Sequence, residues 1–235
     1  AAILESIRST QQDSQPPKGG VIIDNHLTSL PMKKGLSSSA AVCVMVVKSF
    51  AAIWGLELSH ESIMTIARDG ERKTGSMCGI MDFWVVLGPG VALMTMAADG
   101  FFRLDVIHVA QPLFLVVADL RRSKDTRLIL AALNACFPQA TTESARSVHG
   151  YVAHSQDLCL DAVRAIEDGK CTMLAQAMTS AQRLFDDCMQ VCPAQLTAPR
   201  LHEVMGNAAL QRISLASKGI GSQGDGSVQV LCESA

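Results

Sequence analysis

The sequence favours an α+β fold, with a strand-rich part followed by a helix-rich part. Of the 235 residues, 49% are apolar, which is enough to bury a core in one large domain or two small ones. Short apolar runs of strand length and longer runs of helical periodicity both occur, and they are unevenly distributed along the chain. The change from one to the other near residues 120–123 predicts an N-terminal part at 1–121 and a C-terminal part at 122–235.

The first part begins with helical patterns. A helix is expected over residues 1–9, followed by a polar loop and a short buried strand at 20–24. The run from Ser38 to Trp54 is apolar on nearly every side, which indicates a central, fully buried helix ended by Gly55. Ser59 has the character of an N-cap for the next helix, which runs to about Glu71.

The remaining strands and helices are predicted from the same short apolar runs and helical periodicity. Strands are predicted at 91–96, 101–107, 113–120 and 227–232, the first two joined by a hairpin-like turn at 97–100. Helices are predicted from Ser123, as the N-cap, to about 136, and at 142–167, 171–189 and 197–207, with Pro199 in the first turn of the last one.

Composition argues against several classes of protein. The formal net charge is −2 and no basic run occurs, so nucleic-acid binding is not expected. No apolar run approaches the roughly 20 residues of a membrane helix, and no signal peptide is visible. The eight cysteines are scattered without Cys-x-x-Cys pairs, which is typical of reduced core thiols in a cytoplasmic protein.

A small, polar turn opens the apolar helix. Residues 31–41 read Pro-Met-Lys-Lys-Gly-Leu-Ser-Ser-Ser-Ala-Ala. The first N–H groups of a helix lack intrahelical partners, and the helix dipole adds partial positive charge there. An anion such as phosphate is therefore a natural ligand, and Gly35 would let the backbone approach it closely. The alternative is a serine-rich N-cap with no ligand.

A second candidate segment contains two acidic residues. Glu71 precedes a glycine-containing loop, and Cys78-Gly79-Ile80-Met81-Asp82 follows it. Charged residues in loops are usually solvated. Asp82, however, stands between apolar residues, where a carboxylate needs a partner or a function.

A third segment, residues 218–226, contains four glycines and precedes the last strand. Such a loop can approach a ligand closely, although Gly-Asp-Gly also suits a simple hairpin turn.

These three segments resemble the motifs of the GHMP kinases. Residues 31–41 match the family's Pro-(x)-Gly-Leu-(Gly/Ser)-Ser-Ser-Ala motif, and Cys78–Asp82 matches the galactokinase-type Cys-Gly-Ile-Met-Asp. As in mevalonate kinase-type members, a Glu lies eleven residues before the Asp, here Glu71 before Asp82. The third segment matches in position and glycine content. Phe83 replaces the Gln that the family usually has after the Asp.

The resemblance implies a two-lobed α+β fold, with an N-terminal lobe like ribosomal protein S5 domain 2 and a helix-rich, ferredoxin-like C-terminal lobe. It implies ATP and Mg²⁺ as cofactors, Asp82 as the catalytic residue, and Ser39 and Glu71 as metal ligands. Asp82 and Thr126 would contact the substrate. The implied nucleotide-binding residues are Lys34, Gly35, Leu36, Ser37, Ser38, Ser39, Ala40, Gly221, Ser222 and Gly224.

The implied reaction is transfer of the γ-phosphoryl group of ATP to a hydroxyl of a small molecule. The Cys78–Asp82 run favours a sugar, and Phe83 weakens a specific assignment to galactose. Two alternatives stay open: a non-catalytic nucleotide- and sugar-binding relative of galactokinase, and a mevalonate-pathway kinase or decarboxylase. A monomer or homodimer is expected. Because few residues precede the first motif, the sequence also suggests an N-terminally truncated member that lacks the family's basic catalytic residue.

Overall fold

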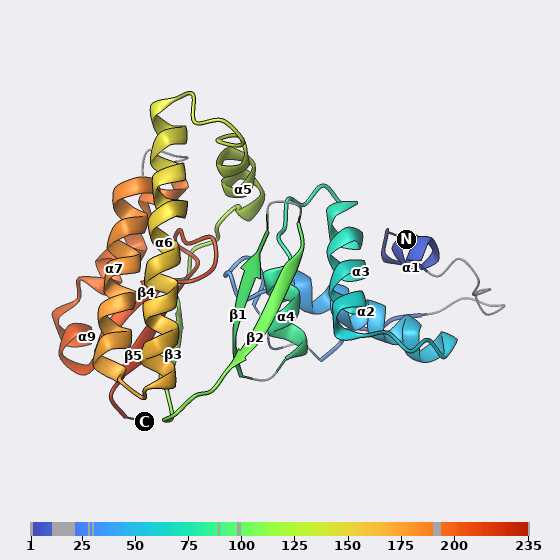
Figure 1. Ribbon diagram of the computed structural model, residues 1–235, viewed down its shortest axis with the longest axis horizontal. Helices are drawn as coiled ribbons and strands as arrows, with labels where there is room; N and C mark the ends of the chain where they lie inside the picture. The colour runs from blue at the N-terminus through green and yellow to red at the C-terminus, as the bar shows by residue number, and fades with distance from the viewer. Residues whose placement is uncertain are drawn as a thin grey trace. The chain divides into compact units, whose positions relative to one another are not determined.

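The computed structural model describes residues 2–10, 22–27, 29, 31–88, 90–97, 100–189 and 194–234 (Figure 1). These residues form two compact units, each described by itself below. Unit 1 comprises residues 1–32 and 36–89, and unit 2 comprises residues 33–35 and 90–235. The predicted lobe boundary at residue 121 lies inside unit 2, and the division into lobes stays a prediction.

Unit 1 is helical in its described part. It contains α1 (Ala2–Thr10), α2 (Ser38–Trp54), α3 (His60–Arg72) and α4 (Met81–Leu87), and α3 contacts each of the other three. Gly55, in the left-handed region at φ 63°, ends α2 as predicted. Ser59 caps α3 by accepting a hydrogen bond from the Ser62 amide at 3.2 Å, also as predicted.

Two expectations for unit 1 are wrong. Helix α2 is not buried all round, because its buried residues form one stripe (Ala40, Val44, Val47 and Ala51) while Val42, Met45 and Ile53 are exposed. Residues 22–24 form no strand, and the Ile22 side chain is 96% exposed. The described part of unit 1 holds no strand with which this segment could pair, and an isolated strand is not stable. The polar loop at 11–20 lies outside the described residues.

Unit 2 contains a hairpin and a three-stranded sheet. Strands β1 (Val91–Met96) and β2 (Phe102–Ile107) pair antiparallel from Val91–Ile107 to Met96–Phe102. The sheet has the order β3-β5-β4, and both of its pairings are antiparallel. Its strands are β3 (Phe114–Asp119), β4 (Ala216–Gly219) and β5 (Ser227–Cys232). The central strand β5 therefore has a hydrogen-bonded neighbour on each side.

Helices cover both faces of the sheet. Helix α6 (Glu143–Glu167) lies beside α7 (Cys171–Met189), which packs on β4 (Figure 1). Leu231 of β5 contributes to the core that these helices form with the sheet, whereas Val228 and Val230 contribute to a core with α8 (Pro199–Met205). The alternation of side chains along β5 thus fills a core on each face.

The other helices of unit 2 are short. They are α5 (Thr126–Asn134), the 3₁₀ helix η1 (Ala194–Thr197) and α9 (Ala208–Ile213). Ser123 is not the cap of α5, contrary to prediction. Asp125 caps it, because its carboxylate accepts from the Arg127 and Leu128 amides at 3.1 Å each. The sequence also missed α4, α9 and β4.

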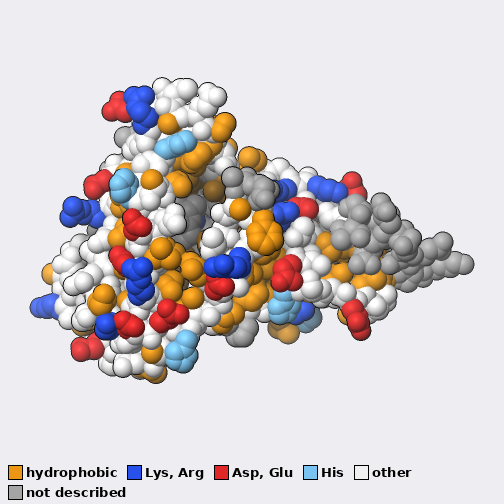
Figure 2. All heavy atoms as spheres, viewed as in Figure 1, with side chains coloured by type: hydrophobic (Ala, Val, Ile, Leu, Met, Phe, Trp, Pro, Cys, Tyr) orange, Lys and Arg blue, Asp and Glu red, His pale blue; other side chains and the backbone are white. Residues whose placement is uncertain are grey.

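Surface and cysteine features complete the description. On the face shown in Figure 2, Lys and Arg side chains are interspersed with Asp and Glu, so the described residues of this face form no broad basic field. Among the described helices, none has the length and apolarity needed to cross a membrane.

The seven described cysteines are free thiols. Cys136 alone among them is buried, so the prediction that the cysteines are core thiols is wrong for most of them. Cys192 lies outside the described residues.

Leu231 and Leu115 offer a direct test of the sheet. They are register partners on β5 and β3, but Leu231 is fully buried while Leu115 is 50% exposed. We expect Leu231→Ala to lower the free energy of unfolding by about 2–5 kcal/mol, through lost burial and a new cavity. Leu115→Ala is the matched control and should cost less than half as much. Urea unfolding curves of both variants measure the difference, and equal losses would contradict the assignment of Leu231 to the core.

Candidate functional site

The backbone that leads into α2 repeatedly adopts the left-handed conformation. Lys33 (φ 60°), Gly35 (φ 79°) and Ser37 (φ 55°) all lie in this region, which only glycine adopts without strain. Such alternating turns direct successive N–H groups toward one side and are typical of anion-binding segments. The chain passes from unit 2 to unit 1 within this segment, between Gly35 and Leu36.

The start of α2 is open to an anion. Ser37 occupies the N-cap position, but its hydroxyl caps no amide of the described residues. The first turn of α2 contains no acidic side chain that could take the place of a ligand. The alternative of an ordinary serine N-cap therefore does not describe this helix, because no side chain of the described residues caps its first N–H groups.

Glu71, at the end of α3, meets Ser39 in the first turn of α2. The Ser39 hydroxyl donates to Glu71 Oε1 at 2.8 Å, and the Ser76 hydroxyl donates to the same oxygen at 3.2 Å. The other oxygen, Glu71 Oε2, is buried and has no hydrogen-bond partner among the described residues. The structure thus brings together the two residues predicted as metal ligands, with one carboxylate oxygen still to be satisfied.

Two thiols that interact electrostatically with Glu71, those of Cys43 and Cys78, have raised pKa values. Burial, followed by the negative charge of Glu71, raises the pKa of Cys43 to about 11. Burial also raises the pKa of Cys78. Both thiols therefore stay protonated at neutral pH and add no second negative charge beside the carboxylate. A hard cation with oxygen ligands fits this environment, since it would satisfy Glu71 Oε2 and balance its charge.

Asp82 lies in the first turn of α4 and is exposed. The sequence suggested that its apolar neighbours would surround the carboxylate, and this is wrong. Ile80 and Phe83 point into the core and are almost fully buried, which leaves Asp82 facing outward. No hydrogen bond joins Asp82 to Ser39 or Glu71 in the described structure. Because Phe83 is buried, its side chain does not line an open pocket.

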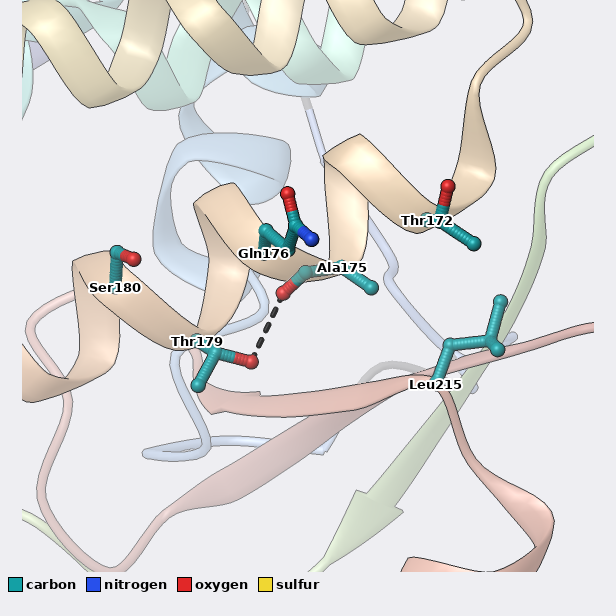
Figure 3. Close-up of a pocket in the computed structure, with 6 residues that line it drawn as sticks. All are labelled: Thr172, Ala175, Gln176, Thr179, Ser180 and Leu215. Atoms are coloured by element: carbon teal, nitrogen blue, oxygen red, sulfur yellow. Dashed lines mark hydrogen bonds between the residues drawn. The ribbon is translucent and has the colours of Figure 1, made fainter.

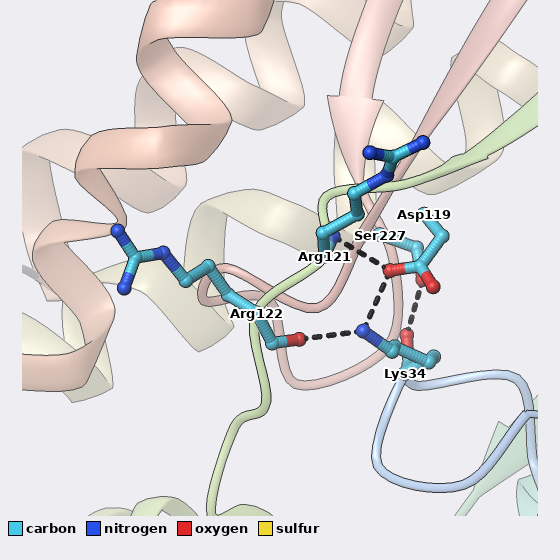
Figure 4. A network of polar contacts seen from close by, with 5 residues as sticks. All are labelled: Lys34, Asp119, Arg121, Arg122 and Ser227. Carbon is cyan, nitrogen blue, oxygen red and sulfur yellow. Dashed lines mark hydrogen bonds and ion pairs between the residues drawn. The ribbon is translucent and has the colours of Figure 1, made fainter.

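In unit 2, Lys34 is held by three other residues (Figure 4). Its ammonium lies 2.6 Å from Asp119 Oδ1 and donates to the Arg122 carbonyl at 2.8 Å. The Ser227 hydroxyl donates to the Lys34 carbonyl at 2.6 Å. The hydrogen bond from Lys34, followed by that from the Arg121 amide, lowers the pKa of Asp119. The Lys34 side chain thus fixes the turn, and its role as a phosphate ligand stays a prediction.

The glycine-rich segment is the loop that joins β4 to β5, and it lies against Gly35. A Cβ atom added to Gly221 would lie 3.2 Å from the Gly35 carbonyl oxygen. Gly221, Gln223 and Gly224 all have positive φ. The Ser222 hydroxyl is buried and has no hydrogen-bond partner among the described residues. The loop connects two antiparallel strands, which agrees with the hairpin turn that Gly-Asp-Gly suggested. It also contacts the first motif at Gly35.

Sequence reasoning missed Lys124, which is only 4% exposed. It belongs to the stretch 121–124, which contains three basic residues and precedes helix α5, where charged side chains are usually solvated. The burial of this one lysine depends on glycines about 90 residues before and 100 residues after it. Thr126, the predicted substrate contact, is the first residue of α5 and is half-buried.

A separate groove lies on α7, and none of the predicted site residues is among the residues that line it. It has a volume of about 370 Å³ and is lined by Thr172, Ala175, Gln176, Thr179, Ser180 and Leu215 (Figure 3). The Thr179 hydroxyl is already used, because it donates to the Ala175 carbonyl at 2.9 Å. The lining contains no titratable group, so the groove offers no acid–base chemistry.

Comparison with known proteins agrees with the motifs. The family described as "GHMP kinases N terminal domain" matches residues 3–88. Mevalonate kinase of Aeropyrum pernix is 27% identical over 162 residues, which cover 67% of this chain and 47% of that protein. The chain thus spans about half the length of this curated relative.

Solved structures show the same fold at low sequence identity. Streptococcus pneumoniae phosphomevalonate kinase, solved with phosphomevalonate and AMPPNP, has a TM-score of 0.69 and 16% identity, over 86% of this chain and 62% of that one. Lactococcus lactis galactokinase, solved with galactose, has a TM-score of 0.68 and 12% identity, over 86% of this chain and 59% of that one. The predicted α+β GHMP kinase fold is confirmed. Residues 3–88 thus match the N-terminal domain of the GHMP kinases, and the motifs and the fold of the chain agree with that match.

Proposed function

We propose that this protein transfers the γ-phosphoryl group of ATP to a hydroxyl group of a small molecule. The observation that carries this proposal is the Ser39–Glu71 contact at the open start of α2. A serine hydroxyl, a carboxylate with one oxygen unsatisfied among the described residues, and the first N–H groups of a helix are what a nucleotide phosphate with its Mg²⁺ requires.

Each part of the proposed site has a defined task. The N–H groups from Leu36 to Ala40 would bind phosphate oxygens, and Ser39 Oγ and Glu71 would hold Mg²⁺. When bound, Mg²⁺ neutralises the charge that develops on the transferred phosphoryl group. Asp82 would orient the acceptor hydroxyl and take its proton as the hydroxyl oxygen attacks phosphorus and ADP leaves. Its exposed position on α4 keeps the carboxylate accessible to an acceptor.

For the acceptor we propose a sugar, because Cys78–Asp82 has the galactokinase-type sequence. Phe83, which departs from the family pattern, is buried in the core and limits how far this sequence argues for galactose itself. The similarity to A. pernix mevalonate kinase favours mevalonate or a related acceptor as the second candidate.

The direct test is ADP release by the protein with Mg-ATP and separate acceptors. The panel should contain free sugars, sugar acids, mevalonate, phosphomevalonate and homoserine. Release that depends on one acceptor would support the kinase and name its substrate. CO₂ release from a phosphorylated mevalonate would instead identify a decarboxylase. ATP binding without turnover on any acceptor would favour the non-catalytic alternative.

Asp82→Asn tests the proposed base. We expect kcat to fall by about a hundredfold or more while ATP affinity changes little, because the amide cannot accept the proton. Asp157→Asn, at an exposed position on α6, is the control and should leave kcat unchanged. Steady-state kinetics together with ATP titration measure both quantities. An equal loss of ATP affinity would argue against a role limited to the acceptor.

Glu71→Gln tests the proposed cation ligand. Replacing the carboxylate by an amide removes the negative charge that Mg²⁺ requires, so the Mg²⁺ concentration for half-maximal activity should rise by about tenfold. Glu57→Gln, at an exposed position before α3, should not shift the titration. If both variants titrate like the unmodified protein, Glu71 does not bind the cation.

A further inference from the structure

Lys124 is buried beneath the Gly35 turn of unit 2. Its ammonium donates to the Ile220 carbonyl at 3.0 Å, and 96% of the residue is removed from solvent. Lysine is rarely buried to this degree, because removing an ammonium from water is costly. A lysine kept at such a position points to a function for its charge or for the contacts that it makes.

Three glycines make room for the Lys124 side chain. A Cβ atom on Gly35 would lie 2.6 Å from Lys124 Nζ, and one on Gly226 would lie 3.2 Å from Lys124 Cδ. A Cβ on Gly221 would lie 3.8 Å from Nζ. The first distance is shorter than real Cβ atoms show, so any other residue at position 35 would displace the lysine. These glycines come from both glycine-containing motifs, and a single side chain fits against all three.

The same contacts fix the backbone of the turn. A Cβ on Gly226 would lie 3.0 Å from the Lys34 carbonyl, and the neighbouring Ser227 hydroxyl donates to that carbonyl. The Lys34 ammonium is itself held by Asp119. The turn at Lys34 and Gly35 is therefore tied to the β4–β5 loop on one side, with the Lys124 charge close to the Gly35 backbone.

We propose that Lys124 is a positioning residue for nucleotide phosphates at the Gly35 turn. It would hold Gly35 in its left-handed conformation against the 220–226 loop and add positive charge next to the Gly35 backbone, where we propose that phosphate binds. This inference rests on the proposed ATP-dependent function. A purely structural lysine would support the loop equally for any ligand, whereas a charge that acts on phosphates distinguishes ATP from adenosine.

The test compares nucleotide affinities of Lys124→Met with those of the unmodified protein. Methionine keeps an unbranched apolar side chain against the glycines but removes the charge. By isothermal titration calorimetry we expect ATP and ADP to bind about tenfold more weakly, the usual size of one charge-assisted contact, with adenosine within twofold. The ATP affinity of the variant should also depend less on salt concentration. Lys170→Met, which removes a surface lysine paired with Asp168, is the control and should change nothing.

The outcomes separate this inference from the proposed function. If the unmodified protein binds no ATP, the proposed function and the inference both fail. If it binds ATP and Lys124→Met binds ATP equally well, the inference alone fails. Equal weakening of ATP and adenosine would show a structural role and would overturn it as well. If Lys124→Met does not fold, Lys124→Gln answers the same question, because its neutral amide can still donate to the Ile220 carbonyl.

Discussion

The central strand β5 is the constraint on which unit 2 depends. It is hydrogen-bonded to β3 and β4, and its alternating side chains fill a core on each face of the sheet. A strand held in this way cannot shift by one residue, because every side chain would then exchange faces. The loop before it is fixed as a consequence, and so is Ser227, whose hydroxyl holds the Lys34 carbonyl. The rigidity of the sheet is thus transmitted to the turn that precedes Gly35.

In unit 1 the comparable feature is the carboxylate of Glu71. Helices α2 and α3 bring it to Ser39, and Ser76 supplies a second donor to the same oxygen. A buried carboxylate oxygen without a partner is costly, and proteins seldom retain one without a function. The thiols of Cys43 and Cys78 stay protonated and therefore add no second negative charge beside it. These observations favour a bound cation more strongly than the motif alone does.

Much of the fold could be predicted from local signals. Helix α2, the Ser59 cap and the β1–β2 hairpin follow from periodicity and capping chemistry. Where the prediction failed, distant residues decided the structure. Residues 22–24 resemble a strand but have no partner, and β4 is a four-residue segment defined by its pairing with β5. Ser123 and Asp125 are both good N-caps, and the sequence did not distinguish between them.

In the candidate site, too, some contacts could be predicted from the sequence and others depend on residues far apart in the chain. The resemblance of the motifs to those of the GHMP kinases implied Ser39 and Glu71 as metal ligands, and the structure places their side chains in contact. The pairing of Lys34 with Asp119 and the burial of Lys124 beside Gly35 join residues 85 or more positions apart, and no local pattern predicts such contacts. Exposure was misjudged for Asp82, because helix α4 turns Ile80 and Phe83 inward and the carboxylate outward.

The most direct test of this account is a crystal structure of the protein with Mg²⁺ and a non-hydrolysable ATP analogue. The account predicts phosphate oxygens within hydrogen-bond distance of the N–H groups of residues 36–40. It also predicts a Mg²⁺ ion about 2.1 Å from Ser39 Oγ and from an oxygen of Glu71. Phosphates bound away from the start of α2, or a Mg²⁺ ion with neither residue as a ligand, would contradict it.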